Sequence, residues 1–219
     1  MALELIPTRV RKRFEIDERH HACAILANDH PAEFADLMGC LEQFKLPRSE
    51  IVYPGGSKTK IAARFDDYLY ARSWNVKSTA VEMMVDGVPR NVKTHSIDLC
   101  KGRVACEVQW NSKDGVFSRD LTTFRLLHEW NIISVGVVIT RSDELQDIFA
   151  GLGWVKDKKD KWQRVASKYG QSATHWSKLI NRIQGGDSGM CPMLLVGIKK
   201  ECYFDDLPDV PTDLTGPKE

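Results

Sequence analysis

Residues 96–109 read SIDLCKGRVACEVQ. This stretch places one acidic residue, Asp98, before a tight turn and a second, Glu107, inside an apolar segment. A Lys-Gly pair ending at Gly102 breaks the chain, and residues 104–110 have the Val and Trp content of a strand. The stretch therefore predicts a β-hairpin with a carboxylate on each side of its turn.

The two faces of the predicted second strand differ in character. Side chains along a strand alternate between its faces. Glu107 and Gln109 therefore share one face with Ala105. The opposite face is formed by Val104, Cys106, Val108 and Trp110. This second, apolar face is expected to lie in the core.

The polar face of this strand has two interpretations. The hairpin can bring Asp98 across to Glu107, and two carboxylates a few ångströms apart repel each other unless a cation lies between them. Hard oxygen ligands suit Mg²⁺, which favours a divalent metal site. Alternatively, Glu107 and Gln109 form only the solvated face of the strand.

The order of these residues resembles a known pattern. An acid at a hairpin followed by Glu-x-Lys on the next strand is the active-site pattern of the PD-(D/E)xK nucleases, with Gln109 here in place of the lysine. The segment RVACEVQW at 103–110, followed by FSRDL at 117–121, is similar to the core of type II restriction endonucleases of the BglII and BstYI branch. The resemblance runs in the family's order from about residue 49 to residue 199.

Other segments contribute to this resemblance. They are Ile51-Val52-Tyr53-Pro54, a helix ending at Ser73-Trp74, and apolar strands at 134–139 and 191–198. The resemblance implies an α/β, restriction-endonuclease-like layered fold with a mixed central sheet flanked by helices. It also implies Mg²⁺-dependent cleavage of double-stranded DNA at a short palindromic site by a homodimer, and a cognate DNA methyltransferase in the host.

The resemblance assigns roles to individual residues. Asp98, Glu107 and the backbone carbonyl of Val108 are the expected Mg²⁺ ligands, for one ion or two. The metal would lower the pKa of a bound water. Gln109 is expected to orient that water, because an amide cannot act as a general base. His95 has two interpretations, a base or a hydrogen-bonded structural residue.

Two further sets of candidates come from the same source. In this branch a polar residue near the end of the second helix also holds the water, and Asn75 and Lys77 are the candidates here. The expected DNA-reading residues are Asn111, Ser112 and Lys113 after the active strand, Arg141, Ser142 and Asp143 after a later strand, and Asp187-Ser188. Asn suits bidentate contact with adenine. The alternative for the two later groups is a solvated turn.

Two other functions stay open on the sequence. A DNA-binding protein of the same fold that has lost cleavage would also lack the lysine. A structure-selective DNA repair nuclease would share the site but would not cut at one sequence. Metal-dependent cutting of DNA would exclude the DNA-binding protein without cleavage. Discrete fragments from a long duplex would exclude the structure-selective repair nuclease.

Composition sets outer limits. The 219 residues are 42% hydrophobic and 28% charged, as in an ordinary globular protein, and predict one nuclease domain over 1–204 with its catalytic core at about 49–200. The Pro- and Asp-rich segment 205–219 is expected to be loosely ordered. Apolar runs are too short for a membrane span, and we expect a cytoplasmic protein without membrane contact.

Charge and cysteine content narrow the chemistry. The net charge of +1 argues against indiscriminate nucleic-acid binding. The basic residues cluster at 9–13, 58–64 and 156–164, and each run is either a DNA contact or a solubilising surface. The six cysteines contain no Cys-x-x-Cys pair, which argues against a zinc site and against a disulfide framework.

The remaining pattern predicts the other elements. Helices are expected at 30–45, after Gly55-Gly56 towards residue 74, at 119–130, from about 143, and at 174–184. Strands are expected at 80–85, 91–98, 132–140 and 192–198. The helix at 119–130 is the candidate for a dimer interface.

Overall fold

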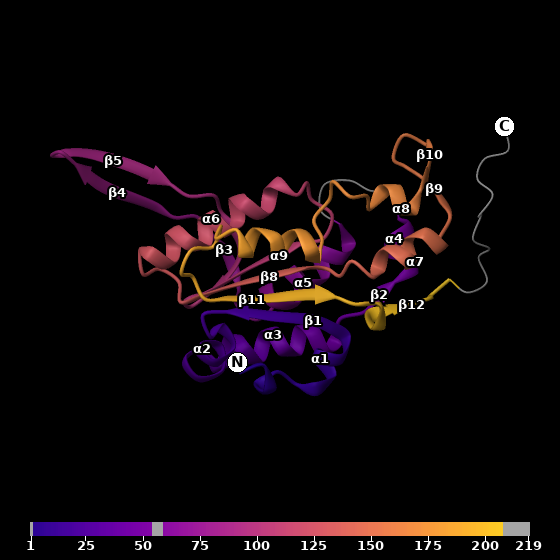
Figure 1. The fold of residues 1–219 in the computed structure, drawn as a ribbon, viewed down its shortest axis with the longest axis horizontal. Coiled ribbons are helices and arrows are strands. Elements are labelled where there is room, and N and C mark those ends of the chain that lie inside the picture. The colour runs from indigo at the N-terminus through magenta and orange to yellow at the C-terminus, as the bar shows by residue number, and fades with distance from the viewer. Residues whose placement is uncertain (1, 54–58, 208–219) are drawn as a thin grey trace.

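The computed structural model describes residues 2–53 and 59–207. A six-stranded sheet crosses its centre (Figure 1). In spatial order the strands are β1 (Phe14–Arg19), β11 (Met193–Ile198), β8 (Val135–Arg141), β7 (Val104–Gln109), β6 (Ile97–Lys101) and β3 (Asn75–Lys77). The three central strands β11, β8 and β7 run parallel, and every other pair is antiparallel. The sheet is mixed, which confirms the predicted fold class.

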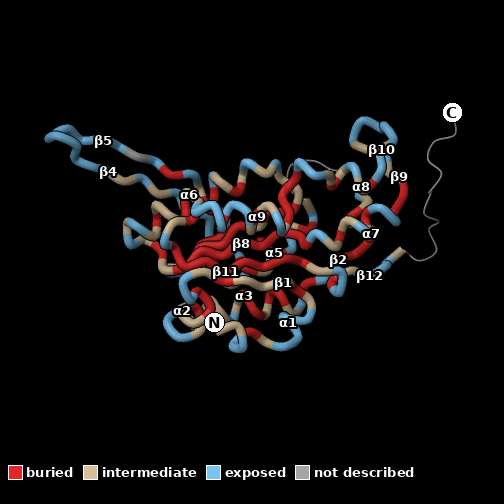
Figure 2. Tube along the Cα trace, viewed as in Figure 1, coloured by how far each residue is buried: buried red, intermediate tan, exposed pale blue. Residues whose placement is uncertain are grey.

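Helices cover both faces of the sheet (Figures 1 and 2). The face below the sheet in Figure 1 carries α1 (Thr8–Arg13), α2 (Ala22–Asp29) and α3 (Pro31–Gln43), and α5 (Lys60–Tyr70) packs against α3, β6 and β7. The opposite face carries α6 (Gly115–Glu129) and α9 (Trp176–Gln184). The central strands are therefore buried on both sides, as their continuous apolar runs require.

The alternation predicted for β7 is confirmed. Cys106 and Trp110 pack into the core beneath α2, α3 and α5, whereas Ala105 packs into the second core beneath α6 and α9. Glu107 and Gln109 continue the Ala105 face but are only 3% and 5% exposed. The interpretation of this face as a solvated one is wrong, because α6 covers it.

The amino-terminal strand was not predicted. β1 reads FEIDER, and its charged side chains hide the pattern of a strand. It pairs antiparallel with β11 over its whole length, from Phe14↔Ile198 to Arg19↔Met193. Because β1 is an edge strand, only one of its sides needs a partner strand, and its polar content is compatible with that place.

Several boundaries differ from expectation. The strand expected at 91–98 divides into β5 (Val88–Lys93) and β6, and β5 forms with β4 (Ala80–Val85) a hairpin that projects from the body (Figure 1). Its turn is only Asp86-Gly87, and both residues have positive φ, 52° and 77°, as a two-residue hairpin turn of this hand requires.

The helix expected at 119–130 begins four residues earlier, as α6. Its apolar residues pack inside the chain against the sheet: Phe117, Leu121, Phe124 and Leu127 are all buried. These apolar residues face inward, as expected, and a dimer interface on the outer side of α6 stays a prediction.

Shorter elements complete the chain. They are η1 (Leu3–Leu5), β2 (Leu46–Pro47), α4 (Arg48–Val52), α7 (Leu145–Gly151), β9 (Trp154–Lys156), β10 (Trp162–Arg164), α8 (Val165–Lys168), η2 (Lys200–Cys202) and β12 (Tyr203–Phe204). The expected loop at Gly55-Gly56 lies outside the described residues.

Two charged segments have structural partners. Arg13 donates to the carbonyls of Leu41, Glu42 and Phe44 at the end of α3, so this part of the first basic run closes a helix. Asp205 accepts from Arg48, and Asp206 accepts from Ser49, so the first residues of the carboxyl-terminal segment have partners in the body of the protein. The loose order expected for residues 205–219 stays a prediction. The remainder, residues 208–219, lies outside the described residues.

All six cysteines are buried and unpaired. Among residues 2–53 and 59–207, no helix has the length and apolar character needed to cross a membrane.

Gly136 in β8 allows a test of how tightly the core is packed. A side chain at Gly136 would place its Cβ 2.8 Å from the Sδ of Met193 and 3.0 Å from the ring of Phe124. Gly136→Val is therefore expected to lower the free energy of unfolding by about 1–3 kcal/mol, measured by urea denaturation. Gly151→Ala is the control, because a Cβ there meets no atom within 4 Å, and it should leave stability unchanged. Equal stabilities for both variants would contradict this account of the core.

Candidate active site

The hairpin of β6 and β7 brings two acids together. Its register pairs Leu99 with Cys106, which sets Asp98 opposite Glu107. The backbone N–H of Asp98 donates to Oε1 of Glu107 over 3.1 Å. The side chain of Glu107 is therefore held against the backbone of the residue that carries the other carboxylate.

These residues line a pocket of about 360 Å³ between α5, the hairpin and the start of α6. The lining comprises Thr59, Ala62, Asp66, His95, Asp98, Glu107, Val108, Gln109, Trp110, Asn111, Ser112, Val116 and Arg119. The structure thus gathers Asp98, Glu107, Val108 and Gln109 in one place, together with His95. Of the loop that follows β7, Asn111 and Ser112 line the pocket, whereas Lys113 is exposed outside the lining.

Glu107 lies in an environment that opposes its negative charge. Burial, followed by the nearby charges of Asp120 and Asp98, raises the pKa of Glu107 to about 9. The hydrogen bond from the Asp98 backbone opposes this shift only in part. A cation in the pocket would reverse the balance, because it attracts the charged form.

Asp120 was not predicted as a site residue. It is 3% exposed on α6, and its Oδ2 accepts from Nε2 of Gln109 over 2.7 Å. Its Oδ1 accepts from Nε and Nη2 of Arg119 over 3.0 and 2.8 Å. Burial raises the pKa of Asp120, and Arg119 opposes that shift. In the sequence this acid stands among the apolar positions of a helix, Phe117, Leu121 and Phe124, and that placement is the signal that could have found it.

Asp66 was also missed. It is buried on α5, one residue after the core residue Phe65, and it adds a third carboxylate to the pocket lining. Within the described parts of the chain, no three or more acidic, histidine or cysteine side chains form a group close enough to hold a metal ion. The close pair is therefore Asp98 and Glu107.

The carboxyl end of β7 is fixed by two hydroxyls. The carbonyl of Gln109 accepts from Oγ1 of Thr140, over 2.8 Å, and from Oγ1 of Thr174, over 3.1 Å. Thr140 is the residue of β8 that pairs with Gln109, and Thr174 lies two residues before α9. The loop after β7 is held in the same way, because the carbonyl of Ser112 accepts from the N–H of Thr174.

Asn111 is partly committed inside the protein. Its Nδ2 donates to the carbonyl of Lys168 over 3.1 Å, and its Oδ1 is buried without a partner among the described residues. In this arrangement Asn111 can offer an acceptor. That acceptor is buried, and one of the two amide protons is bound to Lys168, so this arrangement does not favour the expected bidentate contact with adenine.

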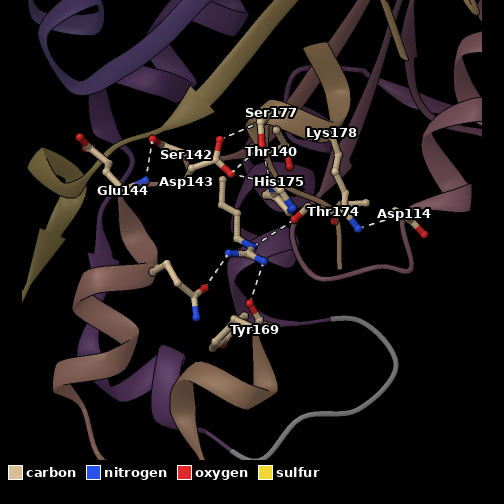
Figure 3. A network of polar contacts seen from close by, with 12 residues as sticks. Asp114, Thr140, Ser142, Asp143, Glu144, Tyr169, Thr174, His175, Ser177 and Lys178 are labelled. Atoms are coloured by element: carbon tan, nitrogen blue, oxygen red, sulfur yellow. Dashed lines mark hydrogen bonds and ion pairs between the residues drawn. The ribbon is translucent and has the colours of Figure 1, made fainter. Parts of the chain in front are cut away.

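Arg141 and Ser142 belong to a polar network around Thr174. Figure 3 labels Ser142 and Thr174 in this network. Arg141 is 2% exposed and donates to the carbonyls of Thr174 and Tyr169 over 3.0 and 2.9 Å. Ser142 is fully buried and donates to Glu15. Burial lowers the pKa of Arg141 to about 10. These positions do not favour the expected contact with bases, because the groups that would read DNA are turned inward.

The neighbouring candidates also have partners within the chain. Asp143 is exposed, accepts from Ser177 N and Oγ, and pairs with His175, so it caps the start of α9. Asp187 accepts from Ser118, and Ser188 is buried.

Asn75 and Lys77 do not reach the site. Both lie on the edge strand β3, where they pair with Cys100 and Ile97, and neither lines the pocket. Nδ2 of Asn75 donates to the carbonyl of Ser73. The sequence pattern placed them near the active strand because β3 follows α5 directly.

The sheet is mixed and flanked by helices, and it carries Asp98 and Glu107 on two neighbouring antiparallel strands. These features define a nuclease with the restriction-endonuclease-like fold. Comparison with protein families makes the assignment specific. The family described as Restriction endonuclease BglII/BglIII matches residues 14–198, and the chain belongs to this family. It is a type II site-specific deoxyribonuclease that acts on DNA. No curated protein matches the chain. The family match begins at Phe14, the first residue of β1, well before the resemblance seen from residue 49.

The raised pKa of Glu107 predicts a pH dependence of stability without metal. In the unfolded chain this carboxyl has its ordinary pKa of 4.5, whereas in the fold it has about 9. The folded protein binds the extra proton between these values, so stability is lost as the pH rises from 4.5 through 9. Glu107→Gln removes this loss. At pH 8.5 in EDTA it is expected to unfold with a free energy higher than wild type by about 1–3 kcal/mol.

The measurement is urea denaturation of both proteins in EDTA at pH 5.5 and 8.5. The control is Glu129→Gln on the exposed end of α6, which should keep the wild-type pH dependence. An unchanged pH dependence in Glu107→Gln would mean that Glu107 titrates normally.

The position of Arg141 predicts a structural effect. Arg141→Ala would leave the carbonyls of Tyr169 and Thr174 without their donor and open a cavity, and is expected to lower the free energy of unfolding by about 2–4 kcal/mol. Thermal and urea denaturation measure this loss. Wild-type stability together with altered cleavage specificity would instead support the base-reading interpretation.

Proposed function

We propose that the protein hydrolyses both strands of duplex DNA at a short palindromic sequence in a reaction that requires Mg²⁺. The observation that carries this proposal is the placement of Asp98 and Glu107 on paired strands at the edge of a pocket, with Glu107 oriented by the backbone of Asp98. Membership of the restriction endonuclease family supplies the class of substrate and reaction.

The donor set fits Mg²⁺. Asp98, Glu107 and the backbone carbonyl of Val108 are oxygen donors, and Mg²⁺ is usually bound through one or two carboxylates, with waters and substrate phosphates completing its octahedron. Val108 lies beyond the last residue of β7 that pairs with β6, on the side of the pocket. The raised pKa of Glu107 supports a cation there, since the two acids otherwise oppose each other's charge.

The bound ion would lower the pKa of a water and stabilise charge on the phosphoryl oxygens. The protein's own groups have simpler tasks. Asp98 and Glu107 supply negative charge, and Gln109 orients the attacking water through its amide. His95 also lines the pocket and its side chain is exposed, which is compatible with either a base or a hydrogen-bonding role there.

Sequence recognition is proposed for the loop after β7. Asn111 and Ser112 line the pocket, and the exposed Lys113 follows them. Asn111 would contact a base edge through its amide once that amide turns away from the carbonyl of Lys168. Lys113 would contact phosphate, which adds affinity but no sequence information.

Two partners follow from a palindromic site. A twofold homodimer places one active site on each strand, and its symmetry matches that of the DNA. A host that contains such an enzyme needs a methyltransferase that modifies the same sequence.

Removal of either acid tests the proposal. Asp98→Ala and Glu107→Ala are each expected to abolish cleavage of unmethylated bacteriophage DNA, with rates at least ~1000-fold below wild type, because each removes a carboxylate that holds the metal. Wild type should give discrete fragments with Mg²⁺ and none with EDTA, and the sequenced ends give the site.

Thermal denaturation checks that the variants fold, and Asp147→Asn on the exposed side of α7 serves as a carboxylate control that should cut normally. A folded variant that cuts at the wild-type rate would exclude its residue from the site. Binding without cutting in every divalent metal would favour the DNA-binding protein that has lost cleavage. A smear without discrete bands would favour the repair nuclease.

A further inference from the structure

The nitrogen of the Gln109 side-chain amide is held by Asp120. Its Nε2 donates to Oδ2 of Asp120 over 2.7 Å, and both side chains are at least nine-tenths buried. The second oxygen of Asp120 accepts both hydrogen bonds from Arg119. Hydrogen bonds thus link the partly exposed guanidinium of Arg119 to Asp120, and Asp120 to the buried amide of Gln109.

These hydrogen bonds fix which end of the Gln109 amide faces the pocket. The oxygen and nitrogen of a glutamine side chain have nearly the same shape, so the partner decides their order. An ionised carboxylate accepts hydrogen bonds and cannot donate them. Asp120 therefore requires the nitrogen of Gln109, and the acceptor Oε1 is the end that Gln109 offers to the pocket. Arg119 supports this order because it stabilises the charged form of Asp120.

The order matters for the attacking water. Hydrolysis joins the water oxygen to phosphorus and breaks an ester P–O bond, and the leaving oxygen ends as an alcohol with one of the water's protons. The water must point a lone pair at phosphorus and a proton at an acceptor. Oε1 of Gln109 can accept that proton's hydrogen bond, whereas a reversed amide would present N–H groups that compete for the lone pair.

We infer that Asp120 is a positioning residue that fixes the donor–acceptor order of Gln109, so that Gln109 presents its carbonyl oxygen to the attacking water. This inference rests on the proposed function. It adds a residue outside the metal site, on a different element, to the reaction.

A swap of the two side chains tests the inference. Asp120→Asn removes the requirement that the nitrogen of Gln109 face position 120. It is expected to lower the single-turnover rate of DNA cleavage about 10–100-fold. Gln109→Glu sets two carboxylates against each other and should lower it about 100-fold or more. The double variant Gln109→Glu, Asp120→Asn restores a donor at position 120 and an acceptor at position 109, while the new amide oxygen at 120 can accept from Arg119. It should cut at least about 10-fold faster than Gln109→Glu alone.

The rates are measured on a duplex that carries the site mapped from the wild-type digest. DNA affinity in EDTA should not fall in any of these variants, so the loss lies in the cleavage step. Asp36→Asn is the matched control, because Asp36 also accepts from two side chains, Trp74 and Lys101, but lies outside the pocket lining. It should reduce stability and leave the rate unchanged.

A second measurement does not depend on catalysis. In wild-type protein labelled with ¹⁵N, the side-chain amide protons of Gln109 should exchange slowly with solvent, as a buried, bonded amide does. Fast exchange would overturn the inference, and so would wild-type cleavage by Asp120→Asn or a double variant no faster than Gln109→Glu. If wild type cuts no DNA with Mg²⁺, the proposed function fails, and the exchange measurement still decides whether Asp120 orders the amide.

Discussion

The burial of a carboxylate on β7 is the constraint on which the site depends. β7 lies between β8 and β6, and its two faces are covered by α5 and α6, so Glu107 has little contact with water. An isolated charge in such a place is expensive, and the protein responds with a raised pKa and with a hydrogen bond from the backbone of Asp98. The same low solvation would strengthen the attraction to a cation, which supports the Mg²⁺ proposed for this site.

Buried polar groups around the site follow a common rule. Several of them are fixed by partners from elements that are distant in the sequence. Asp120 on α6 binds Gln109 on β7, and Arg141 at the end of β8 binds carbonyls that precede α9. Such networks are costly when one member is lost and rigid when all members are present. They hold the amide of Gln109 and the loop after β7 in defined positions.

Sequence patterns predicted the central strands of the sheet and the pair Asp98 and Glu107. They did not predict the polar side chains that surround this pair. The hairpin at 96–109 was recognisable because its apolar alternation and its turn residues are local signals. The roles of Asp120 and Asp66 depend on which helix covers which face, and that is decided by long-range packing. The burial of Arg141 and Ser142 has the same cause: their polar side chains follow a strand, but in the fold they bind the segment before α9 and Glu15. β1 was missed because an edge strand can carry charges that conceal its pattern.

The two hydroxyls on the carbonyl of Gln109 have a consequence for local motion. Thr140 and Thr174 bind this one oxygen from two different elements, and Thr174 N also holds the loop that begins at Asn111. The end of β7, the end of β8 and the start of α9 are thus joined at a single atom. Local opening of the chain needs all of these bonds to break together. The end of β7 and the segment before α9 are therefore expected to open as one cooperative unit, and their backbone amides should exchange with the same opening free energy.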